Sequence, residues 1–264
     1  MQHLTQIYHP IVARPFERKI YREIPPCAAL RPYIRCFWEQ DGSRSDPWLV
    51  VPDTCADLIF KVSPDGKVQH YFCGIGDAPF WSQPTANGER TFGVRFYGWS
   101  AALFAGETLR GTANGLFETE AYFPWVTGEL LEKLAAGKPE EEAALLEQVL
   151  CRQLESVSPD GNFMQAVYRI LSADGNLSLR DLSFETALSA RQLERLFSQN
   201  LGLSPKKLAE LVRYQLLWQQ MLLPGFDPQD AVERFGFYDQ SHLLHAFKRC
   251  HGLSPAQALR LAGR

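Results

Sequence analysis

The sequence predicts a two-domain α+β protein. We expect an N-terminal antiparallel β-sheet or barrel with helices, then an all-α domain with two helix-turn-helix motifs joined by a connecting helix. Three observations predict this. Short β-type runs fill residues 1–100, helical periodicity follows from Ser100 on, and one motif occurs twice near the C-terminus. The length of 264 residues suits one large or two modest domains.

The first hundred residues are interpreted as a series of short strands. The runs YIRCFWEQ, DLIFKV, VQHYFC and RTFGVRFYG are rich in β-branched and aromatic residues. Pro64, Asp65 and Gly66 stand between the second and third runs, where they predict the turn of a hairpin. Several strands at this spacing favour an antiparallel sheet or a small barrel.

Helical periodicity marks the segment that follows. LEKLAAG and EEEAALLEQVLCRQLES predict helices, the second of roughly four turns. Residues 156–162, SVSPDGN, predict a linker because Ser, Pro, Asp and Gly cluster there. We therefore expect a first domain over 1–155, β-rich to about residue 100 and then helical, and a helical domain over 163–264.

An internal repeat is the strongest pattern in the chain. SARQLERLFSQNLGLSP (189–205) matches DQSHLLHAFKRCHGLSP (239–255) at an offset of 50 residues. Each copy predicts a helix capped by Ser189 or Asp239, a glycine at its end, and a Ser-Pro start of the next helix. A short amphipathic segment precedes each copy (179–187 and 228–236), and residues 205–223 predict a connecting helix of about five turns. Helix, short turn, helix is the helix-turn-helix form, and it occurs twice.

The second helix of each unit has two unlike faces. Leu193, Leu196 and Phe197 form an apolar face in the first unit, and Leu243, Ala246 and Phe247 do so in the second. A duplicated packing unit in a helical bundle would also explain these apolar faces. The opposite faces favour nucleic-acid binding, because Arg, Gln, Ser and His side chains reach base edges or phosphates.

These residues resemble the AraC/XylS family of bacterial transcription regulators over roughly residues 164–262. The segment GFYDQSHLLHAFKRCHGLSP (236–255) is similar to the family signature nearly letter for letter, and LSARQLERLFSQNLGLSPKKL is similar to the first helix-turn-helix of the family. The resemblance implies a seven-helix DNA-binding domain. Its two recognition helices, about 190–201 and 240–251, would enter successive major-groove segments on one face of double-stranded DNA.

The resemblance also implies which side chains meet DNA. Glu194 has two interpretations, as an acceptor from cytosine or as a residue that holds Arg191 or Arg195 in place. A solvated surface charge is the alternative interpretation for each lysine. The expected base-reading residues are Arg191, Gln192, Glu194, Arg195, Gln240, Ser241, His242 and His245, and the expected phosphate contacts are Ser204, Lys206, Lys207, Lys248, Arg249 and Ser254.

Two departures from the family pattern concern the units themselves. Ala187 stands where the first unit of the family usually has glycine, so a turn with positive φ would be strained there. His245 stands where the second unit often has arginine. Since histidine is shorter and mostly neutral at pH 7, we expect weaker readout by the second unit.

The resemblance implies that the N-terminal half, residues 1–155, is a sensor or dimerisation domain, and this half carries candidates for a ligand pocket. FWEQ (37–40), VPDTCADLIF (51–60), CGIGDAPF (73–80) and GVRF (93–96) resemble a poorly characterised N-terminal domain of some family members, which names no ligand. The pocket candidates combine aromatic walls with polar anchors; barrel core and strand-end ion pairs are the alternative. These candidates are Trp38, Glu39, Asp53, Asp57, Phe80, Trp81, Arg95 and Phe96, with Trp99 as a further aromatic.

The six cysteines suggest one rival hypothesis. Some DNA-repair proteins join such a DNA-binding half to a zinc-bound cysteine that accepts methyl groups. Cys27, Cys36, Cys55 and Cys73 lack the close pairs of such a zinc site. We expect reduced, buried thiols and no metal or cofactor, and a methyl-accepting, redox-responsive or metal-responsive protein remains the alternative.

Charge and targeting complete the prediction. The formal net charge of -3 argues against a nucleic-acid partner. Residues 1–159 hold 15 basic against 20 acidic residues, however, and residues 160–264 hold 12 against 10, so the helical half is mildly basic. No enzyme motif, export signal or long apolar run is present. We expect a cytoplasmic bacterial regulator, not an enzyme, with DNA, a small-molecule effector, RNA polymerase if it activates, and a second copy as partners, and no membrane association.

Overall fold

The computed structural model describes residues 4–13, 21–40, 47, 49–82 and 88–263. A short helix α1 (Leu4–Ile7) precedes an antiparallel six-stranded sheet. The order of strands in this sheet is β1 (Tyr21–Ile24), β2 (Ile34–Gln40), β7 (Arg90–Tyr97), β4 (Cys55–Val62), β5 (Val68–Cys73) and β8 (Leu116–Glu118). A separate two-stranded ribbon pairs β3 (Leu49–Val50) with β6 (Phe80–Trp81). The β4–β5 pair confirms the predicted hairpin, with Gly66 at φ 81° in its turn.

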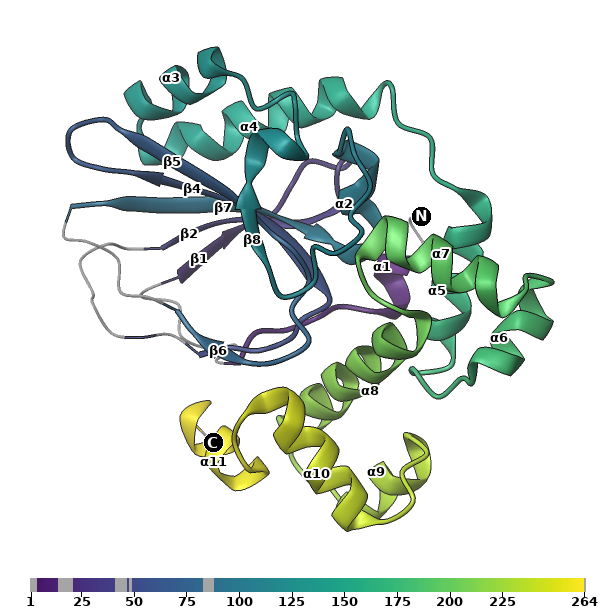
Figure 1. Ribbon diagram of the computed structural model, residues 1–264. Helices are drawn as coiled ribbons and strands as arrows, with labels where there is room; N and C mark the ends of the chain where they lie inside the picture. The colour runs from purple at the N-terminus through teal and green to yellow at the C-terminus, as the bar shows by residue number, and fades with distance from the viewer. Residues whose placement is uncertain (1–3, 14–20, 41–46, 48, 83–87, 264) are drawn as a thin grey trace.

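Helices cover one face of the sheet, as Figure 1 shows for α3 (Gly128–Ala136) and α4 (Pro139–Leu154). α2 (Gly98–Phe104) contacts β7 on the same side, and a 3₁₀ turn, η1 (Thr119–Ala121), follows β8. Because side chains alternate along a strand, Leu58, Val94 and Phe96 point into this core. The Phe96 ring lies 5.4 Å from that of Phe104 and 6.1 Å from that of Phe123.

Seven helices form the C-terminal domain within the described residues. They are α5 (Gly161–Ser172), α6 (Leu179–Thr186), α7 (Ala190–Leu201), α8 (Pro205–Met221), α9 (Pro228–Arg234), α10 (Gln240–His251) and α11 (Pro255–Leu261). The predicted α+β architecture, with two helix-turn-helix motifs and a connecting helix α8, is confirmed (Figure 1). Asp160 caps α5, so this helix begins at Gly161, within the last residues of the segment that the sequence predicts as a linker.

The contacts between the sheet half and the helical half include those of α2 with α7 and those of residues 8–13 with α8. α2 lies against α7, where Gly98 leaves room for Leu201, and the N–H of Leu109 donates to the carbonyl of Gln199 at 2.8 Å. Residues 8–13, here called the strap, lie between the sheet and α8. Ile11 N–H donates to Gln215 Oε1 at 2.8 Å, and Gln215 Nε2 donates to the carbonyls of Ile11 and Pro52. The strap therefore fills the junction between the halves.

Candidate nucleic-acid interface

Helix α7, which the sequence predicts as the first recognition helix, exposes the expected polar face. Leu193, Leu196 and Phe197 are buried, whereas Arg191, Gln192, Glu194 and Arg195 are exposed. The buried stripe packs against α5, where the rings of Phe163 and Phe197 lie 5.3 Å apart. This packing fixes the helix and leaves its N-terminal half facing solvent.

Gln192 has a local role in this structure. Its Oε1 accepts from the backbone N–H and from the hydroxyl of Ser189, both at 2.8 Å, and the Ser189 hydroxyl accepts from the Gln192 N–H. This capping box stabilises the start of α7, so Gln192 would have to leave it to reach a base. Among the ion pairs of the described residues, none joins Glu194 to Arg191 or Arg195.

Helix α10, which the sequence predicts as the second recognition helix, also has an exposed polar face opposite a buried apolar face. Its exposed residues include Gln240, Ser241, His242 and His245, opposite buried Leu243 and Phe247. His242 Nδ1 accepts from the N–H of Tyr238 at 3.2 Å, and the His242 ring lies edge-on to Phe237. The Gln240 amide lies 3.5 Å from Gln229 of α9. Ser241 and His245 are exposed on the outer face.

The predicted phosphate contacts fall into two groups. Lys206 and Lys248 are exposed, whereas Lys207 and Arg249 are ion-paired. Lys207 Nζ lies 3.1 Å from Asp77 Oδ2 and 3.5 Å from Glu210 Oε2, and Arg249 lies 3.6 Å from the same Glu210 oxygen. Although partial burial disfavours the charged form, Asp77 and Glu210 raise the pKa of Lys207.

Ser204 and Ser254 begin α8 and α11, each followed by proline at the first helical position. The Ser204 hydroxyl accepts from the N–H of Lys207 at 3.1 Å, and that of Ser254 accepts from Gln257 N–H at 3.4 Å. The predicted N-caps are therefore confirmed. Backbone N–H groups of each first turn point outward along the helix axis, which is the arrangement that binds anions.

The turns inside the two units differ. Ala187 adopts the left-handed conformation at φ 55° and ψ 26°, so the first unit uses the glycine-type turn without glycine. Three residues, 187–189, separate α6 from α7. Five residues, 235–239, separate α9 from α10, and Gly236 takes φ 63° there. A non-glycine residue in the left-handed conformation costs free energy. Ala187 therefore makes the turn of the first unit less stable than a glycine would.

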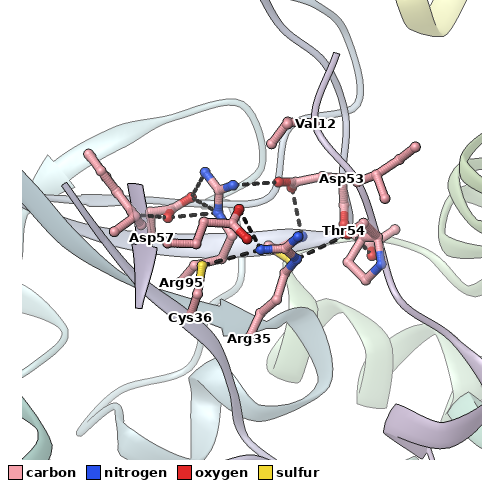
Figure 2. A network of polar contacts seen from close by, with 12 residues as sticks. Val12, Arg35, Cys36, Asp53, Thr54, Asp57 and Arg95 are labelled. Atoms are coloured by element: carbon pink, nitrogen blue, oxygen red, sulfur yellow. Dashed lines mark hydrogen bonds and ion pairs between the residues drawn. The ribbon is translucent and has the colours of Figure 1, made fainter. Parts of the chain in front are cut away.

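Four of the predicted pocket residues meet in a buried polar network on the sheet face opposite α2–α4. Arg95 lies between Asp57, with Nε–Oδ1 at 3.0 Å, and Asp53, with Nη1–Oδ2 at 3.4 Å (Figure 2). Trp38 Nε1 donates to Asp57 Oδ1 at 2.8 Å. Burial raises the pKa of the Asp57 carboxyl, and the Arg95 guanidinium opposes that shift. Each charge in this cluster has a partner, as buried ions require.

The strap closes this network on one side. Arg35 Nε donates to the carbonyl of Pro10 at 3.0 Å, and Arg35 Nη1 lies 2.7 Å from Glu23 Oε1. Arg35 Nη1 also lies 3.2 Å from Cys36 Sγ, and Figure 2 shows Arg35 beside Arg95 and Asp53. The tyrosine hydroxyl of Tyr8 pairs with Thr54 Oγ1 at 3.0 Å. The polar cluster is thus continuous with the backbone of residues 8–13.

The other pocket candidates lie apart from this network. Phe96 is fully buried in the core on the opposite sheet face, and Glu39 is ion-paired with Arg22. Phe80 and Trp81 are 50% and 51% exposed on the β3–β6 ribbon. A hollow beside Trp38 and Glu39 has a volume of about 10 Å³, room for a single water. A larger cleft of about 370 Å³ lies between α3 and α4, lined by Lys133, Leu134, Gly137, Glu141, Glu142, Ala144, Leu145 and Gln148.

The cysteines differ in part from the expectation of buried thiols. Cys36, Cys55 and Cys250 are buried, but Cys27, Cys73 and Cys151 are partly exposed, so that part of the expectation is wrong. Within the described residues no three His, Cys, Asp or Glu side chains gather as metal ligands.

Gln215 is a residue that sequence reasoning missed. It is fully buried in α8, and its amide links the strap to Pro52 of the sheet half. A signal was available, because position 215 continues the apolar stripe of Leu208, Leu211 and Trp218 at helical spacing. A polar residue on such a stripe indicates a buried hydrogen-bond partner.

Comparisons with known proteins match the two halves separately. Residues 182–260 match a family described as a helix-turn-helix domain, and residues 22–116 match a domain of unknown function (DUF6597). The arabinose operon regulatory protein of Escherichia coli (strain K12) is 25% identical over 209 residues, which are 74% of this chain and 69% of the relative.

Two solved structures illustrate the structural similarity. The C-terminal domain of AraT, a response regulator from Geobacillus stearothermophilus, covers 39% of this chain and 86% of its own, at 25% identity and a TM-score of 0.36. ToxT from Vibrio cholerae covers 92% of this chain and 99% of its own, at 9% identity and a TM-score of 0.45.

One further observation concerns membranes. Among the helices of the described residues, none has both the length and the apolar character to cross a bilayer. The sequence matches support a DNA-binding transcriptional regulator: residues 182–260 are similar to a helix-turn-helix domain, residues 22–116 are similar to a domain of unknown function, and the chain is similar to the arabinose operon regulatory protein.

Proposed function

We propose that α7 and α10 read two successive major-groove segments of one DNA site. The observation that carries this proposal is the outward polar face of each recognition helix, opposite an apolar face that is buried in its own unit. Arginine on guanine is the commonest specific contact in the major groove. Arg191 and Arg195 give the first unit this chemistry, and Ser241 and His245 give the second unit shorter, weaker readers.

The phosphate contacts in this proposal come from Lys206, Lys248 and the starts of α8 and α11. Lysines beside a recognition helix bind any sequence, because phosphates carry no sequence information. The helical half has a small positive balance, 12 basic against 10 acidic residues over 160–264. Modest non-specific affinity and reliance on base contacts follow from this small excess.

The test uses the full-length protein on a site found by genome-wide footprinting. Arg195→Ala should cost about 1–3 kcal/mol on the cognate site and relax discrimination between bases. Lys248→Ala should weaken binding to cognate and random DNA alike and lower the salt slope by about one. Fluorescence anisotropy over a salt series measures both. Equal losses on both DNAs for Arg195→Ala would assign that residue to phosphate and contradict the base-reading role.

The N-terminal half would modulate this DNA binding. Asp77 neutralises Lys207, which a DNA phosphate would otherwise engage. The strap and Gln215 tie α8, which joins the two units, to the sheet half. A ligand or a second copy that favours one arrangement of these contacts would shift DNA affinity by its preference between the two states. A small-molecule effector, RNA polymerase and homodimerisation stay predictions.

Asp77→Asn tests the first of these contacts. Freed from Asp77, with Glu210 as its remaining partner, Lys207 should raise DNA affinity by up to about fivefold, the range of one exposed ion pair, and steepen the salt dependence by up to about one phosphate contact. Asp65→Asn is the matched control, since it removes the same charge from the exposed β4–β5 turn. If both variants shift affinity equally, net charge explains the effect and the contact has no regulatory part.

The rival hypothesis of a methyl-accepting or metal-dependent repair protein is not favoured. It needs a cluster of thiolates on zinc, and the described cysteines supply no such group. Metal analysis of the purified protein is the direct check: stoichiometric zinc bound through cysteine would revive the hypothesis.

A further inference from the structure

Two cysteines from distant parts of the chain meet at the edge of the sheet half. The sulfur atoms of Cys27 and Cys151 lie 3.7 Å apart, although 124 positions separate them in sequence. Cys27 follows β1, and Cys151 belongs to the last turn of α4. The sulfur atoms of a disulfide lie about 2.05 Å apart, so a small movement of the two side chains would bring these sulfurs to bonding distance.

The backbone around both cysteines is held in place. The N–H of Cys27 donates to the Glu147 carboxylate, and Glu147 lies one helical turn before Cys151 on the same face of α4. The Cys27 carbonyl accepts from the N–H groups of Leu30 and Arg31, both at 3.1 Å. The two thiols therefore meet in a fixed geometry that the hydrogen bond of Cys27 to α4 enforces.

Solvent reaches this pair. Cys27 and Cys151 are both partly exposed, whereas Cys36, Cys55 and Cys250 are buried. Cys73 is also partly exposed, but its thiol donates to the carbonyl of Gly74 at 3.7 Å and has no cysteine partner among the described contacts. Accessibility and a neighbouring thiol together are the requirements for a disulfide that forms under oxidation.

We propose that Cys27 and Cys151 form a reversible intramolecular disulfide. The oxidant class is a hydroperoxide or a small-molecule disulfide. With hydrogen peroxide, one thiol is oxidised to a sulfenic acid as the O–O bond breaks and one water leaves. The second sulfur then displaces the hydroxyl as a second water, and the S–S bond forms. Two thiols and one peroxide thus give one disulfide and two waters, and a dithiol reductant restores both thiols.

The reaction should accelerate as pH rises. Burial, and then the contact with Cys27, raise the pKa of the Cys151 thiol to about 11. The thiolate is the reacting form, so a step in which Cys151 is the attacking sulfur is slow at neutral pH and accelerates as pH rises. This pH dependence distinguishes the pair from a low-pKa sensor cysteine.

The bond would tie the C-terminal end of α4 to the segment that leads into β2. That segment also holds the start of α2, because Trp99 Nε1 donates to the carbonyl of Pro32 at 3.3 Å and Tyr97 N–H to that of Tyr33 at 3.0 Å. A disulfide restricts the unfolded chain more than the folded one. The oxidised protein should therefore melt at a higher temperature than the reduced protein.

The experiment treats the full-length protein with hydrogen peroxide or oxidised glutathione and counts thiols by alkylation in denaturant. The wild type should fall from six alkylated cysteines to four, lose the mass of two hydrogens, and yield one crosslinked peptide joining Cys27 to Cys151. Cys27→Ser and Cys151→Ser should each abolish the crosslink and the rise in melting temperature. Cys73→Ser, the matched control, should retain both.

Two results would overturn the proposal. One is a mapped disulfide between other cysteines or between two chains. The other is full alkylation of Cys27 and Cys151 after prolonged treatment at alkaline pH with an oxidant dose that oxidises free glutathione completely. Neither readout involves DNA, so the outcome is independent of the proposed reading of DNA by α7 and α10.

Discussion

The two helix-turn-helix units differ at the residue that ends the second helix of each unit, which is leucine in the first unit and histidine in the second. Leu201 ends α7, and its side chain lies beside Gly98 of α2 in the sheet half. The residue fifty positions later, His251, ends α10 and is fully buried in its own domain. Its Nδ1 pairs with the Tyr214 hydroxyl at 2.8 Å, and its ring stacks on Phe247.

This difference teaches how a duplicated unit acquires two roles. The apolar residue of the first unit serves a contact between the two halves of the chain. The polar residue of the second unit serves a contact with α8. The first unit is therefore coupled to the sheet half through packing, whereas the second carries a buried titratable group that makes its stability depend on pH.

The largest expected effect concerns His251. Burial lowers the pKa of His251 from 6.5 to about 4, and its Nε2 has no hydrogen-bond partner among the described residues. The folded state thus favours neutral histidine. The contribution of neutral His251 to the free energy of unfolding is fully present above pH 6.5 and is lost as pH falls towards 4. Once the histidine is protonated in both the folded and the unfolded state, the free energy of unfolding is lower by about 3 kcal/mol.

Chemical denaturation at several pH values measures this dependence. His251→Gln should flatten the slope of unfolding free energy between pH 6.5 and 4. His245→Gln, which changes an exposed histidine of the same helix, should keep the wild-type slope. An unchanged slope in His251→Gln would remove the titration of this residue as the cause.

A middle effect is expected at the α2–α7 contact. A Cβ at Gly98 would lie 2.5 Å from the Thr54 carbonyl oxygen, 2.8 Å from Ile75 Cδ1 and 3.0 Å from Leu201 Cδ2. Gly98→Ala should destabilise the protein by about 1–3 kcal/mol, as overpacking does. It should also increase hydrogen exchange at the end of α7 while leaving α10 protected.

Gly128→Ala is the matched control for Gly98→Ala. Gly128 also begins a helix, α3, and a Cβ there meets nothing within 4 Å. Thermal unfolding should show no loss, or a gain of up to about 1 kcal/mol from the stiffer unfolded chain. If both variants lost similar stability, the cause would be the substitution of a glycine at a helix start and not the contact between α2 and α7.

The smallest effects are expected at the two turns. Ala187→Gly should stabilise the first unit by up to about 1 kcal/mol, because glycine adopts φ 55° without the alanine penalty but adds unfolded-state entropy. Gly236→Ala should destabilise the second by about 1 kcal/mol or more, since it combines φ 63° with a Cβ 2.6 Å from the Asn176 amide. Opposite shifts in Tm are the expected signature; shifts of the same sign would contradict the role of φ.

Local chemistry explains what could be predicted from the sequence. Ser189, Asp239, Ser204 and Ser254 cap their helices as expected, because a hydroxyl or carboxylate reaches only the next turn of its own chain. The glycines after α7 and α10 take the left-handed conformation for the same local reason. The internal repeat was enough to predict the two helix-turn-helix units and the helix that connects them.

Long-range packing explains what could not be predicted. The sequence grouped Phe96 with Arg95 as pocket residues, yet adjacent residues on a strand point to opposite faces, so one lies in the core and the other in the polar network. The meeting of Cys27 with Cys151 depends on how α4 crosses the sheet. Neither spacing nor composition contains that information.

The strap has a consequence for the order in which the protein folds. Ile11 and Val12 bond to Gln215 and Trp218, more than 200 positions later in the chain. Synthesis proceeds from the N-terminus, so the strap leaves the ribosome long before α8 and waits for its partners until α8 has been made. Contacts of such long sequence separation form slowly. The strap is therefore among the last of the described segments to reach its native place, and its contacts with α8 form only when the helical half is present.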